Sequence, residues 1–374
     1  MIVNKSVILI SSLFHGGAEK CVSTFLGSLS ELELESIDLI LLYDNIFFEI
    51  PDKLNVIVLS NRKPPSNFLI KILDLIVFSF KLFRLSRKHK YKIVQSYLFY
   101  CNYINLFSRI WGAPHSVQVF NRSSISRYYT DKFADKLKLF LLKSLYRNAD
   151  LILSNSLGVS FEIGKVVKNV ELKVIHNIFD ILLVEKKSLE EVSYSFDDDK
   201  EYIVIVARLI NLKRHIDLFN AIKTLESKHK DIHVLCLGDG ECKSFLMNEV
   251  VRLDLTEKIT FLGAIKNPYP FFRRASIAVL CSEVEGFPNV LVEALINNCA
   301  VVSSNCKHGP AEILEDGKYG LLYSVGNIEE LVGHLSELLT NRFLADKYQN
   351  IGKLRAKDFD ISIIKPSLLR VLDI

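Results

Sequence analysis

Short apolar runs alternate with longer amphipathic runs along the first half of the chain. Apolar runs of about four to eight residues are typical of buried strands in a parallel sheet, whereas apolar positions three or four apart are typical of helices. Helices are predicted from about residue 18, over 68–92 and around 131–147. This pattern predicts one doubly wound α/β unit. Its predicted strands are 6–11, 37–43, 56–59, 91–97, 115–120, 150–156 and 171–177.

The same alternation starts again after a polar stretch. Residues 182–200 are charged and lack a sustained period, which is typical of a connection between domains. We therefore expect a first domain at 1–182, a second at 183–356, and a helix at 357–374 that crosses back to the first. Ligands of such sheets bind at the carboxyl ends of the strands, facing the cleft between the domains. The second unit has predicted strands at 201–209, 232–240, 258–265, 277–282 and 300–304, and predicted helices at 215–230 and about 288–298.

Composition agrees with two globular domains and excludes several other classes. The chain has 374 residues, more than one core usually supports, and is 49% apolar and 24% charged. These values exclude a disordered chain and a protein with many membrane spans. The seven cysteines are scattered without a C-x-x-C pair, which favours a reducing compartment over a disulfide or zinc framework. The apolar run from Val7 to Phe14 is followed by Gly-Gly, which indicates a first strand and not a signal peptide.

Positive charge gathers in the first half of the chain. Residues 1–180 carry 23 Lys and Arg against 15 Asp and Glu, a net +8, so the other 194 residues sum to −4. The stretch 61–92 holds nine cations and one acid, Asp74, among Phe, Leu and Ile residues. Such a helix either lies on an anionic membrane surface or packs as an ordinary amphipathic helix on its sheet. The charges within the apolar run argue against a spanning helix, and no nucleic-acid-binding motif accompanies them.

Three motifs follow predicted strands, and the first is LFHGGAEK at 13–20. Gly16 and Gly17 allow backbone amides to approach an anion at a helix N-terminus. The motif lacks the G-x-G-x-x-G spacing of dinucleotide-binding proteins. Gly-Gly is also common in plain tight turns, so this motif leaves both interpretations open.

The second motif is ARLINLKRHIDL at 207–218. Arg208 and Lys213 lie five residues apart across a short turn, so a planar guanidinium and an ammonium can converge on one diphosphate. The alternative is two solvated surface charges, the usual fate of Lys and Arg. Arg208 leaves an apolar strand at its carboxyl end, which is where ligands bind in this fold class.

The third motif is SEVEGFPNVLVEAL at 282–295. Pro288 suits the first turn of a helix, so Glu285 precedes that helix and Glu293 lies inside it. Pro288 and Glu293 are then about 7–8 Å apart along the axis, comparable to the span of a diphosphate between a sugar and a ribose. Glu293 can accept hydrogen bonds from ribose hydroxyls and Glu285 from sugar hydroxyls, while the helix N-terminus faces the phosphates. Two ordinary surface glutamates are the alternative.

Together these motifs resemble a known family. GGAEK, ARLINLK, LGDGE at 237–241, SEVEGFPNVLVEAL and GPAEIL at 309–314 occur in the order and spacing of the retaining GT-B glycosyltransferases of family GT4. The resemblance covers nearly the whole chain and is strongest over 201–325. It is closest to members that build bacterial O-antigen, capsule or lipid-linked oligosaccharides. The resemblance implies a GT-B fold of two Rossmann-like domains and a nucleotide-diphosphate sugar, expected to be a UDP-sugar, as the donor.

The resemblance also implies roles for individual residues. Arg208 and Lys213 would neutralise the leaving diphosphate in place of a metal ion, with Glu285 as the third catalytic residue near the donor sugar. Glu293 would bind the ribose. Asn177 in VIHNIFD matches a structural asparagine of the family. The implied donor-binding set comprises Gly16, Gly17, Gly238, Gly240, Ile265, Gly286, Phe287, Pro288, Asn289, Val290 and Glu293.

The chain departs from the family pattern in its first domain. Many relatives carry histidines where this chain has Tyr97 and, near VFNRSS, Asn121 and Arg122. In retaining transfer by front-face attack the departing phosphate oxygen can accept the acceptor's proton, so the protein supplies mainly electrostatic stabilisation. The candidates for contact with the acceptor are His15, Tyr97 and Arg122. His308, before Gly309 and Pro310, is a weaker histidine candidate.

The resemblance thus implies a metal-independent, retaining hexosyltransferase without a cofactor. It would move a hexose or N-acetylhexosamine to a lipid-linked or growing glycan acceptor, at the cytoplasmic face of a bacterial plasma membrane, held there by the basic helix 68–92. A nucleotide-sugar 2-epimerase and a non-catalytic membrane assembly partner are the alternatives. The run Asp197-Asp198-Asp199 precedes a strand instead of following one, which favours a solvated acidic loop over a metal-binding motif.

Overall fold

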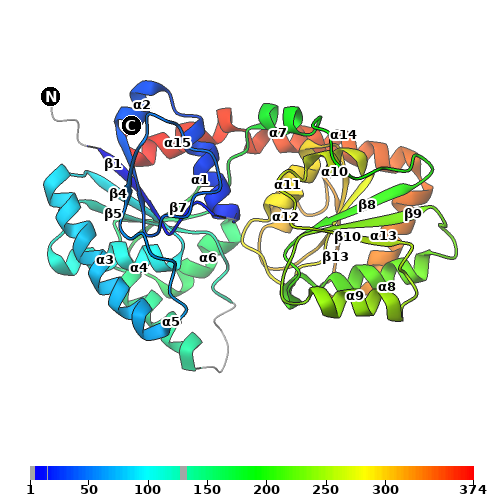
Figure 1. The fold of residues 1–374 in the computed structure, drawn as a ribbon, viewed down its shortest axis with the longest axis horizontal. Helices are drawn as coiled ribbons and strands as arrows, with labels where there is room; N and C mark the ends of the chain where they lie inside the picture. Colours follow the sequence, from blue (N-terminus) through cyan, green and yellow to red (C-terminus); the bar gives the residue numbers. More distant parts are fainter. Residues whose placement is uncertain (1–4, 15, 127–132) are drawn as a thin grey trace. The chain divides into compact units, whose positions relative to one another are not determined.

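The computed structural model describes residues 5–14, 16–126 and 133–374, and the chain divides into two compact units. Unit 1 comprises Met1–Phe179 and Ile361–Ile374, and unit 2 comprises Asp180–Asp360. The sequence placed the two divisions at 182/183 and 356/357, within a few residues of these positions. Each unit is an open parallel sheet with helices on both faces (Figure 1).

The sheet of unit 1 has seven parallel strands in the order β3-β2-β1-β4-β5-β6-β7. The strand order reverses between β1 and β4, which is the position where doubly wound sheets bind ligands. β1, β2, β4 and β6 are buried along their whole length, in agreement with their continuous apolar sequences. The strands are β1 (Ser6–Ile10), β2 (Ile37–Leu41), β3 (Asn55–Val58), β4 (Ile93–Tyr97), β5 (Ser116–Asn121), β6 (Leu151–Ser154) and β7 (Glu171–Val174).

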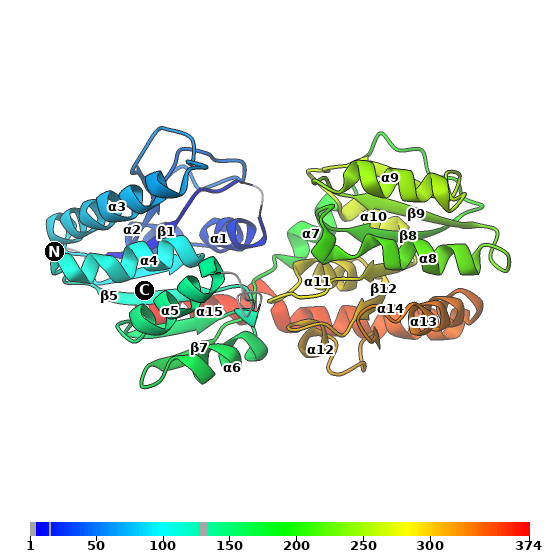
Figure 2. The same cartoon turned by 90° about the horizontal axis from the view of Figure 1, so that it is seen from below.

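Two layers of helices cover this sheet. α1 and the C-terminal helix α15 pack on one face, where Phe25 and Leu368 join the core. α3, α4, α5 and α6 contribute to the cores on the other face, and α3 and α4 lie side by side (Figures 1 and 2). The helices of unit 1 are α1 (Gly17–Gly27), α2 (Glu31–Glu35), α3 (Phe68–His89), α4 (Phe99–Ser108), η1 (Arg109–Trp111), α5 (Phe133–Tyr146), α6 (Leu157–Val166) and α15 (Ile361–Leu372).

The sheet of unit 2 has six parallel strands in the order β10-β9-β8-β11-β12-β13. The order reverses between β8 and β11, so the loops that follow these two strands are neighbours at the carboxyl edge. β8 ends at Val206 and β9 at Leu237, a few residues earlier than their apolar runs indicated. The strands are β8 (Glu201–Val206), β9 (Ile232–Leu237), β10 (Ile259–Gly263), β11 (Ile277–Leu280), β12 (Ala300–Ser304) and β13 (Leu321–Tyr323).

Helices also cover both faces of the second sheet. α8, α9 and α13 pack on one face around Phe219 and Leu331, and α10 and α11 contact the strands from the other. Within the described ranges of the chain, the structure contains no helix both long and apolar enough to span a bilayer. The helices of unit 2 are α7 (Ile181–Lys187), η3 (Asn211–Lys213), α8 (His215–Leu225), α9 (Lys243–Arg252), α10 (Tyr269–Arg274), α11 (Asn289–Ile296), α12 (Pro310–Ile313), α13 (Ile328–Thr340), α14 (Arg342–Ala356) and η4 (Lys357–Phe359).

Candidate functional site

The motifs of unit 2 gather at the carboxyl edge of its sheet. Arg208 follows β8, Gly238 follows β9, Glu285 follows β11 and His308 follows β12. These four strands are consecutive neighbours in the sheet, so their loops form one continuous surface. This surface is the candidate donor site.

Two glycines hold the loop that carries Arg208. Gly238 has a φ of +139°, and a Cβ there would lie 1.9 Å from the carbonyl oxygen of Ala207. A Cβ on Gly240 would lie 2.4 Å from the carbonyl oxygen of Leu209. Both glycines therefore support the backbone on either side of Arg208 by close packing. A direct contact of Gly238 or Gly240 with a donor stays a prediction.

Arg208 itself is exposed, whereas Lys213 is partly buried. The Arg208 carbonyl oxygen accepts a hydrogen bond from the Ile210 amide at 2.9 Å, and within the part of the chain that the structure describes the Arg208 guanidinium makes no hydrogen bond or ion pair. Lys213 ends the 3-10 helix η3, and its Nζ forms an ion pair with the Glu285 carboxylate. An ammonium has three donors, so Lys213 keeps donors for an anion while it bonds Glu285.

Glu285 is anchored from three sides. Its Oε1 accepts hydrogen bonds from Lys213 and from the Ser282 hydroxyl, the latter at 2.6 Å. The backbone carbonyl of Glu285 accepts a hydrogen bond from the His308 amide at 3.0 Å, which ties the loop after β11 to the loop after β12. The sequence analysis predicted neither the Lys213–Glu285 ion pair nor the contact of Ser282 with Glu285. The only sign of Ser282 in the sequence is that a serine stands three residues before Glu285.

The segment from Gly286 to Val290 forms the entry to α11. The helix begins at Asn289, with Pro288 as N-cap, and no side chain caps this end. Gly309, at a φ of +98°, packs against the segment, because a Cβ there would lie 2.6 Å from Pro288 Cδ and 2.9 Å from the Gly286 carbonyl oxygen. A helix N-terminus held in this way offers backbone N–H groups to an anion.

Glu293 lies on α11 and is only 5% exposed. The alternative interpretation, in which Glu293 is an ordinary exposed residue, is therefore wrong. Carboxylates are rarely this buried unless they are paired. The burial agrees with a binding role for Glu293 and does not by itself identify the ligand.

Two further residues are Ile265, which belongs to the sequence-derived set, and Cys306, which the sequence did not single out. Ile265 follows β10, which β9 and β8 separate from β11 in the sheet. Three strand spacings amount to about 14 Å, so the structure does not bring Ile265 next to Glu285. Cys306 lies near Glu285, but burial, with a smaller contribution from Glu285, raises the pKa of its thiol to about 12. Cys306 is thus a protonated, unreactive thiol at neutral pH.

The motifs of unit 1 gather at the carboxyl edge of the other sheet. Gly16 is the N-cap of α1, and the Glu19 carboxylate lies against it. Arg122, directly after β5, donates hydrogen bonds to Asn177 Oδ1 at 2.6 Å and to the Gly17 carbonyl oxygen at 3.4 Å. The loops after β1, β5 and β7 are therefore connected through one guanidinium. Asn177 has the structural role that the sequence indicated.

For the other two acceptor-side candidates, Tyr97 and His15, the described part of the structure gives no contact that indicates an acceptor site. Tyr97 is 3% exposed, and its hydroxyl donates a hydrogen bond to Gln95 Oε1 at 2.6 Å, inside the core. Burial raises the pKa of the Tyr97 phenol well above its usual range, so it is neutral. Contact of Tyr97 with an acceptor stays a prediction. His15 lies outside the described residues.

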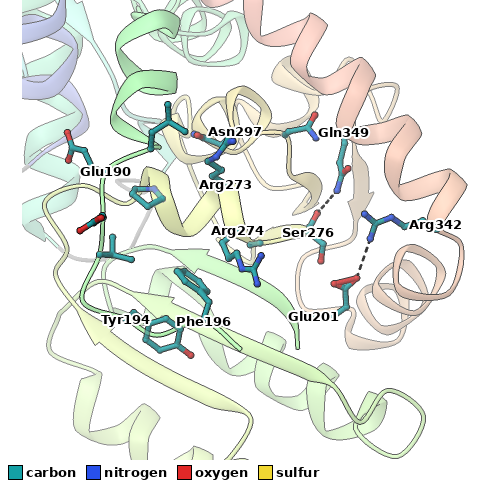
Figure 3. Close-up of a pocket in the computed structure, with 16 residues that line it drawn as sticks. Glu190, Tyr194, Phe196, Glu201, Arg273, Arg274, Ser276, Asn297, Arg342 and Gln349 are labelled. Atoms are coloured by element: carbon teal, nitrogen blue, oxygen red, sulfur yellow. Dashed lines mark hydrogen bonds and ion pairs between the residues drawn. The ribbon is translucent and has the colours of Figure 1, made fainter. Parts of the chain in front are cut away.

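A hollow of about 870 Å³ lies elsewhere in unit 2 (Figure 3). Its walls include Glu201 at the start of β8, Ser276 before β11 and Asn298 before β12, so it lies at the amino edge of the sheet. The candidate site lies at the opposite edge, and none of its residues lines this hollow. Asp198 of the acidic run forms an ion pair with Arg274 beside the hollow.

Comparison with known proteins identifies the family. Residues 186–356 match the model of "Glycosyl transferases group 1". A Campylobacter jejuni protein is 33% identical over 99% of this chain and 100% of its own length. That protein is named N-acetylgalactosamine-N,N'-diacetylbacillosaminyl-diphospho-undecaprenol 4-alpha-N-acetylgalactosaminyltransferase. Further relatives are glycosyltransferases named for lipopolysaccharide core and capsular polysaccharide biosynthesis.

Solved structures match the fold at lower sequence identity. A sucrose-phosphate synthase from Thermosynechococcus elongatus superposes with a TM-score of 0.83 at 16% identity, covering 99% of this chain and 98% of that one. Anabaena Alr3699/HepE in complex with UDP and glucose superposes with a TM-score of 0.79 at 18% identity, covering 99% of each chain. These matches agree with the GT-B fold. The relatives described here are transferases, so the epimerase alternative has no support.

Proposed function

Because this chain is a glycosyltransferase that belongs to the group 1 glycosyl transferases, we propose that it moves a hexose or N-acetylhexosamine from a UDP-sugar to a lipid-linked or growing glycan of the bacterial surface. The name of the Campylobacter relative supports an N-acetylhexosamine and a polyprenyl-diphosphate acceptor. One observation carries the assignment of the site. Lys213, Glu285 and Ser282 are bonded together at the switch point of the unit 2 sheet, and Lys213 shares the loop after β8 with Arg208.

In the proposed donor site one elongated ligand, the nucleotide-sugar, contacts all of these residues. Arg208 and Lys213 bind the diphosphate and stabilise the negative charge that develops on it as the bond to the sugar breaks. The N-terminal amides of α11 bind the same phosphates. Glu285 accepts hydrogen bonds from sugar hydroxyls, and its ion pair with Lys213 holds the carboxylate in place. Glu293 accepts hydrogen bonds from the ribose.

The proposed transfer retains the anomeric configuration and uses no metal ion. The bond from the anomeric carbon to the phosphate oxygen breaks, and the acceptor hydroxyl forms its bond on the same face. The departing phosphate oxygen takes the proton of that hydroxyl, so no protein base is required. Two protein cations, Arg208 and Lys213, supply the positive charge that a metal ion supplies in other phosphate chemistry.

Unit 1 is the proposed acceptor-binding and membrane-facing unit. Asp74, the acid in the basic stretch, is buried and pairs with Arg62 and with the Tyr43 hydroxyl. The outer face of α3 therefore presents cations and apolar side chains.

Trp111 of η1 extends this face, since its indole N–H donates to Ser79 at 3.0 Å and its ring contacts Phe80. The exposed apolar residues are Phe68, Leu69, Ile70, Ile72, Leu73, Ile76, Val77, Phe80, Ile110 and Trp111.

Such a face fits the cytoplasmic leaflet of a bacterial membrane. Apolar side chains insert at the boundary of the headgroups and acyl chains, and the cations of α3 attract anionic lipids. Phe78 and Leu82 on the inner side of α3 pack on the sheet, so the helix also serves the structural role that its sequence allowed. This placement would bring the acceptor's lipid anchor to unit 1.

Turnover of variants tests the donor-site assignment. We expect Arg208→Ala and Lys213→Ala to lower kcat/KM for sugar transfer by roughly 100- to 1000-fold, because each removes a charge that stabilises the leaving diphosphate. Arg252→Ala is the matched control, since Arg252 is an exposed arginine of α9 paired with Glu249. Circular dichroism checks that each variant is folded. Full activity of folded Arg208→Ala and Lys213→Ala would refute the assignment.

A further inference from the structure

The second sequence motif contains an ion pair directly after Lys213. Arg214 lies between η3 and α8, and Asp217 lies in the first turn of α8. The Nε and Nη2 atoms of Arg214 donate to the two carboxylate oxygens of Asp217, at 2.8 Å and 3.1 Å. A guanidinium that bonds both oxygens of a carboxylate is held in one orientation. The pair therefore fixes the Arg214 side chain against the start of α8.

The acidic member of this pair is buried. The side chain of Asp217 is 3% exposed and that of Arg214 is 33% exposed. Within the described residues the Asp217 carboxylate has no other partner, and a carboxylate this buried requires a paired cation. The loop after β13 also packs on the guanidinium, because a Cβ on Gly326 would lie 2.9 Å from Arg214 Nη2. The guanidinium is thus held in place, and Asp217 occupies its fork of donors.

The backbone of Arg214 is in the left-handed region, with φ +47° and ψ +41°. This conformation turns the chain from η3 into α8. The Arg214 amide donates to the Asn211 carbonyl oxygen, and the Arg214 carbonyl oxygen accepts from the Asp217 amide, both at 3.0 Å. Glycine adopts this region without strain, whereas a residue with a Cβ does not. An arginine at such a position indicates that its side chain contributes an interaction that offsets the strain.

Lys213 lies between two fixed points of its loop. On one side, the Leu212 carbonyl oxygen accepts a hydrogen bond from the Glu283 amide at 2.9 Å, which ties η3 to the loop after β11. On the other side, Arg214 fixes the turn into α8. Because a lysine side chain is a flexible stem, the backbone on both sides of Lys213 sets the region that its ammonium can reach. In this arrangement the ammonium reaches Glu285.

We propose that Arg214 and Asp217 are positioning residues, whose ion pair holds the left-handed turn after Lys213 and thereby directs the Lys213 ammonium to the donor diphosphate. This inference rests on the proposed function, because it requires that Lys213 binds that diphosphate. Neither member of the pair contacts the ligand. Asp217 occupies the donors of Arg214 and neutralises its charge, so the phosphate-binding cations remain Arg208 and Lys213.

Two other roles for the pair give different results in a binding experiment. A pair that only stabilises the fold would lower Tm when it is broken and would leave nucleotide binding unchanged. A guanidinium that itself binds phosphate would be released by Asp217→Asn, so UDP would bind more tightly. A positioning pair predicts weaker binding of the second phosphate alone. UMP lacks that phosphate and therefore serves as the reference ligand.

Calorimetric titration of the full chain with UDP and with UMP tests the proposal. We expect Asp217→Asn to lower the ratio of the UMP Kd to the UDP Kd by about 3- to 10-fold, with the UMP Kd unchanged. Arg214→Lys should act in the same way, because an ammonium keeps the charge but cannot form the planar two-bond contact. The matched control is Glu249→Gln, which breaks an arginine–carboxylate contact to Arg252, three residues away on α9, and should leave the ratio unchanged. Circular dichroism checks that each variant is folded.

A double-variant cycle shows whether the pair acts through Lys213. Lys213→Ala should lower the ratio by more than Asp217→Asn does. The double variant Lys213→Ala/Asp217→Asn should lower it no further, because a positioning residue has no effect once the group that it positions is gone. Additive losses, stronger UDP binding, or an unchanged ratio in folded Asp217→Asn or Arg214→Lys would each overturn the inference and leave the donor site standing. If the wild-type protein does not prefer UDP to UMP, or Lys213→Ala keeps that preference, the proposed donor site fails and the inference fails with it.

Discussion

At the residue scale, the candidate donor site depends on how one carboxylate is held. Glu285 is about 13% exposed and accepts hydrogen bonds from an ammonium and a hydroxyl on the same oxygen, Oε1. Both contacts fix the orientation of the carboxylate and leave the second oxygen, Oε2, for the proposed contact with a sugar hydroxyl. This geometry supports the proposed role of Glu285 in holding the donor sugar.

Glu19 is a carboxylate in the opposite situation. Burial raises its pKa, and a hydrogen bond from its own backbone and the charge of Arg122 only partly offset this effect. Because the pKa is raised in the folded state, the folded state holds the proton more tightly than the unfolded state, and stability is lost as pH rises through the folded pKa. Ionised Glu19 therefore destabilises unit 1 at neutral pH.

We expect Glu19→Gln to raise Tm at pH 7 and to have no effect near pH 4, where both states of the wild-type protein are protonated at this position. The gain should appear as pH rises above about 4.5. Glu35→Gln, at an exposed position in α2, is the control and should show no such pH-dependent gain. Thermal unfolding between pH 4 and 8 measures the effect. A constant difference between Glu19→Gln and wild type across this range would contradict the burial argument.

Some of these residues could be found in the sequence and others could not. Arg208, Lys213 and Glu285 follow predicted strands and Glu293 lies in a predicted helix, so local pattern was enough to name them as candidates. The Lys213–Glu285 ion pair joins positions 72 residues apart, and only the strand order of the folded sheet brings them together. The buried hydrogen bonds that join Asn102, Tyr146 and Asn121 were equally hidden, because isolated Asn and Tyr residues have no sequence pattern that distinguishes a buried network from a surface.

At the element scale, α3 combines two faces with different requirements. Phe78 and Leu82 are buried against the sheet, while the first turns, from Phe68 to Leu73, are exposed. An exposed apolar face of this extent is unusual on a monomeric protein and marks an interaction surface. Its cations support the proposed binding to an anionic lipid surface.

Vesicle binding tests this face. We expect the wild-type protein to cosediment with vesicles containing about 30% phosphatidylglycerol, and less so at high salt, because salt screens the attraction between the cations and the lipid. The double variant Leu69→Ser/Leu73→Ser should weaken binding by roughly 100-fold, since the membrane-bound protein would no longer insert two leucine side chains into the lipid. Leu32→Ser is the control, because Leu32 is 78% exposed but lies on α2. Absence of wild-type binding would refute the membrane proposal.

The elements themselves were predicted with uneven success. Long apolar strands such as β4 and β9 were recognisable because they are buried on both sides. α4 was missed, because its buried residues include Asn102 and Asn105 and the segment lacks an ordinary polar face. β13 was also missed, since its three residues carry too little pattern to identify a strand.

At the scale of the whole molecule, the chain repeats one architecture twice. Each unit is a parallel sheet whose strand order reverses once, beside its first strand. The sequence predicted the two-fold division and the final helix, because the polar connection and the restart of the strand pattern are local features. The strand orders had to come from the structure, since apolar runs do not specify their neighbours.

If Arg208 and Lys213 hold the donor diphosphate as proposed, this glycosyltransferase should bind its donor without a metal ion. We expect UDP to raise Tm by more than UMP does, because the second phosphate adds contacts to Arg208 and Lys213, and a ligand that binds only the folded state stabilises it by mass action. Adding EDTA should leave the shift unchanged. Arg208→Ala and Lys213→Ala should each reduce the UDP shift toward the UMP value, whereas Arg252→Ala should not. Loss of the UDP shift in EDTA, with recovery on adding Mg²⁺ or Mn²⁺, would show that a metal neutralises the diphosphate and that the two cations do not suffice.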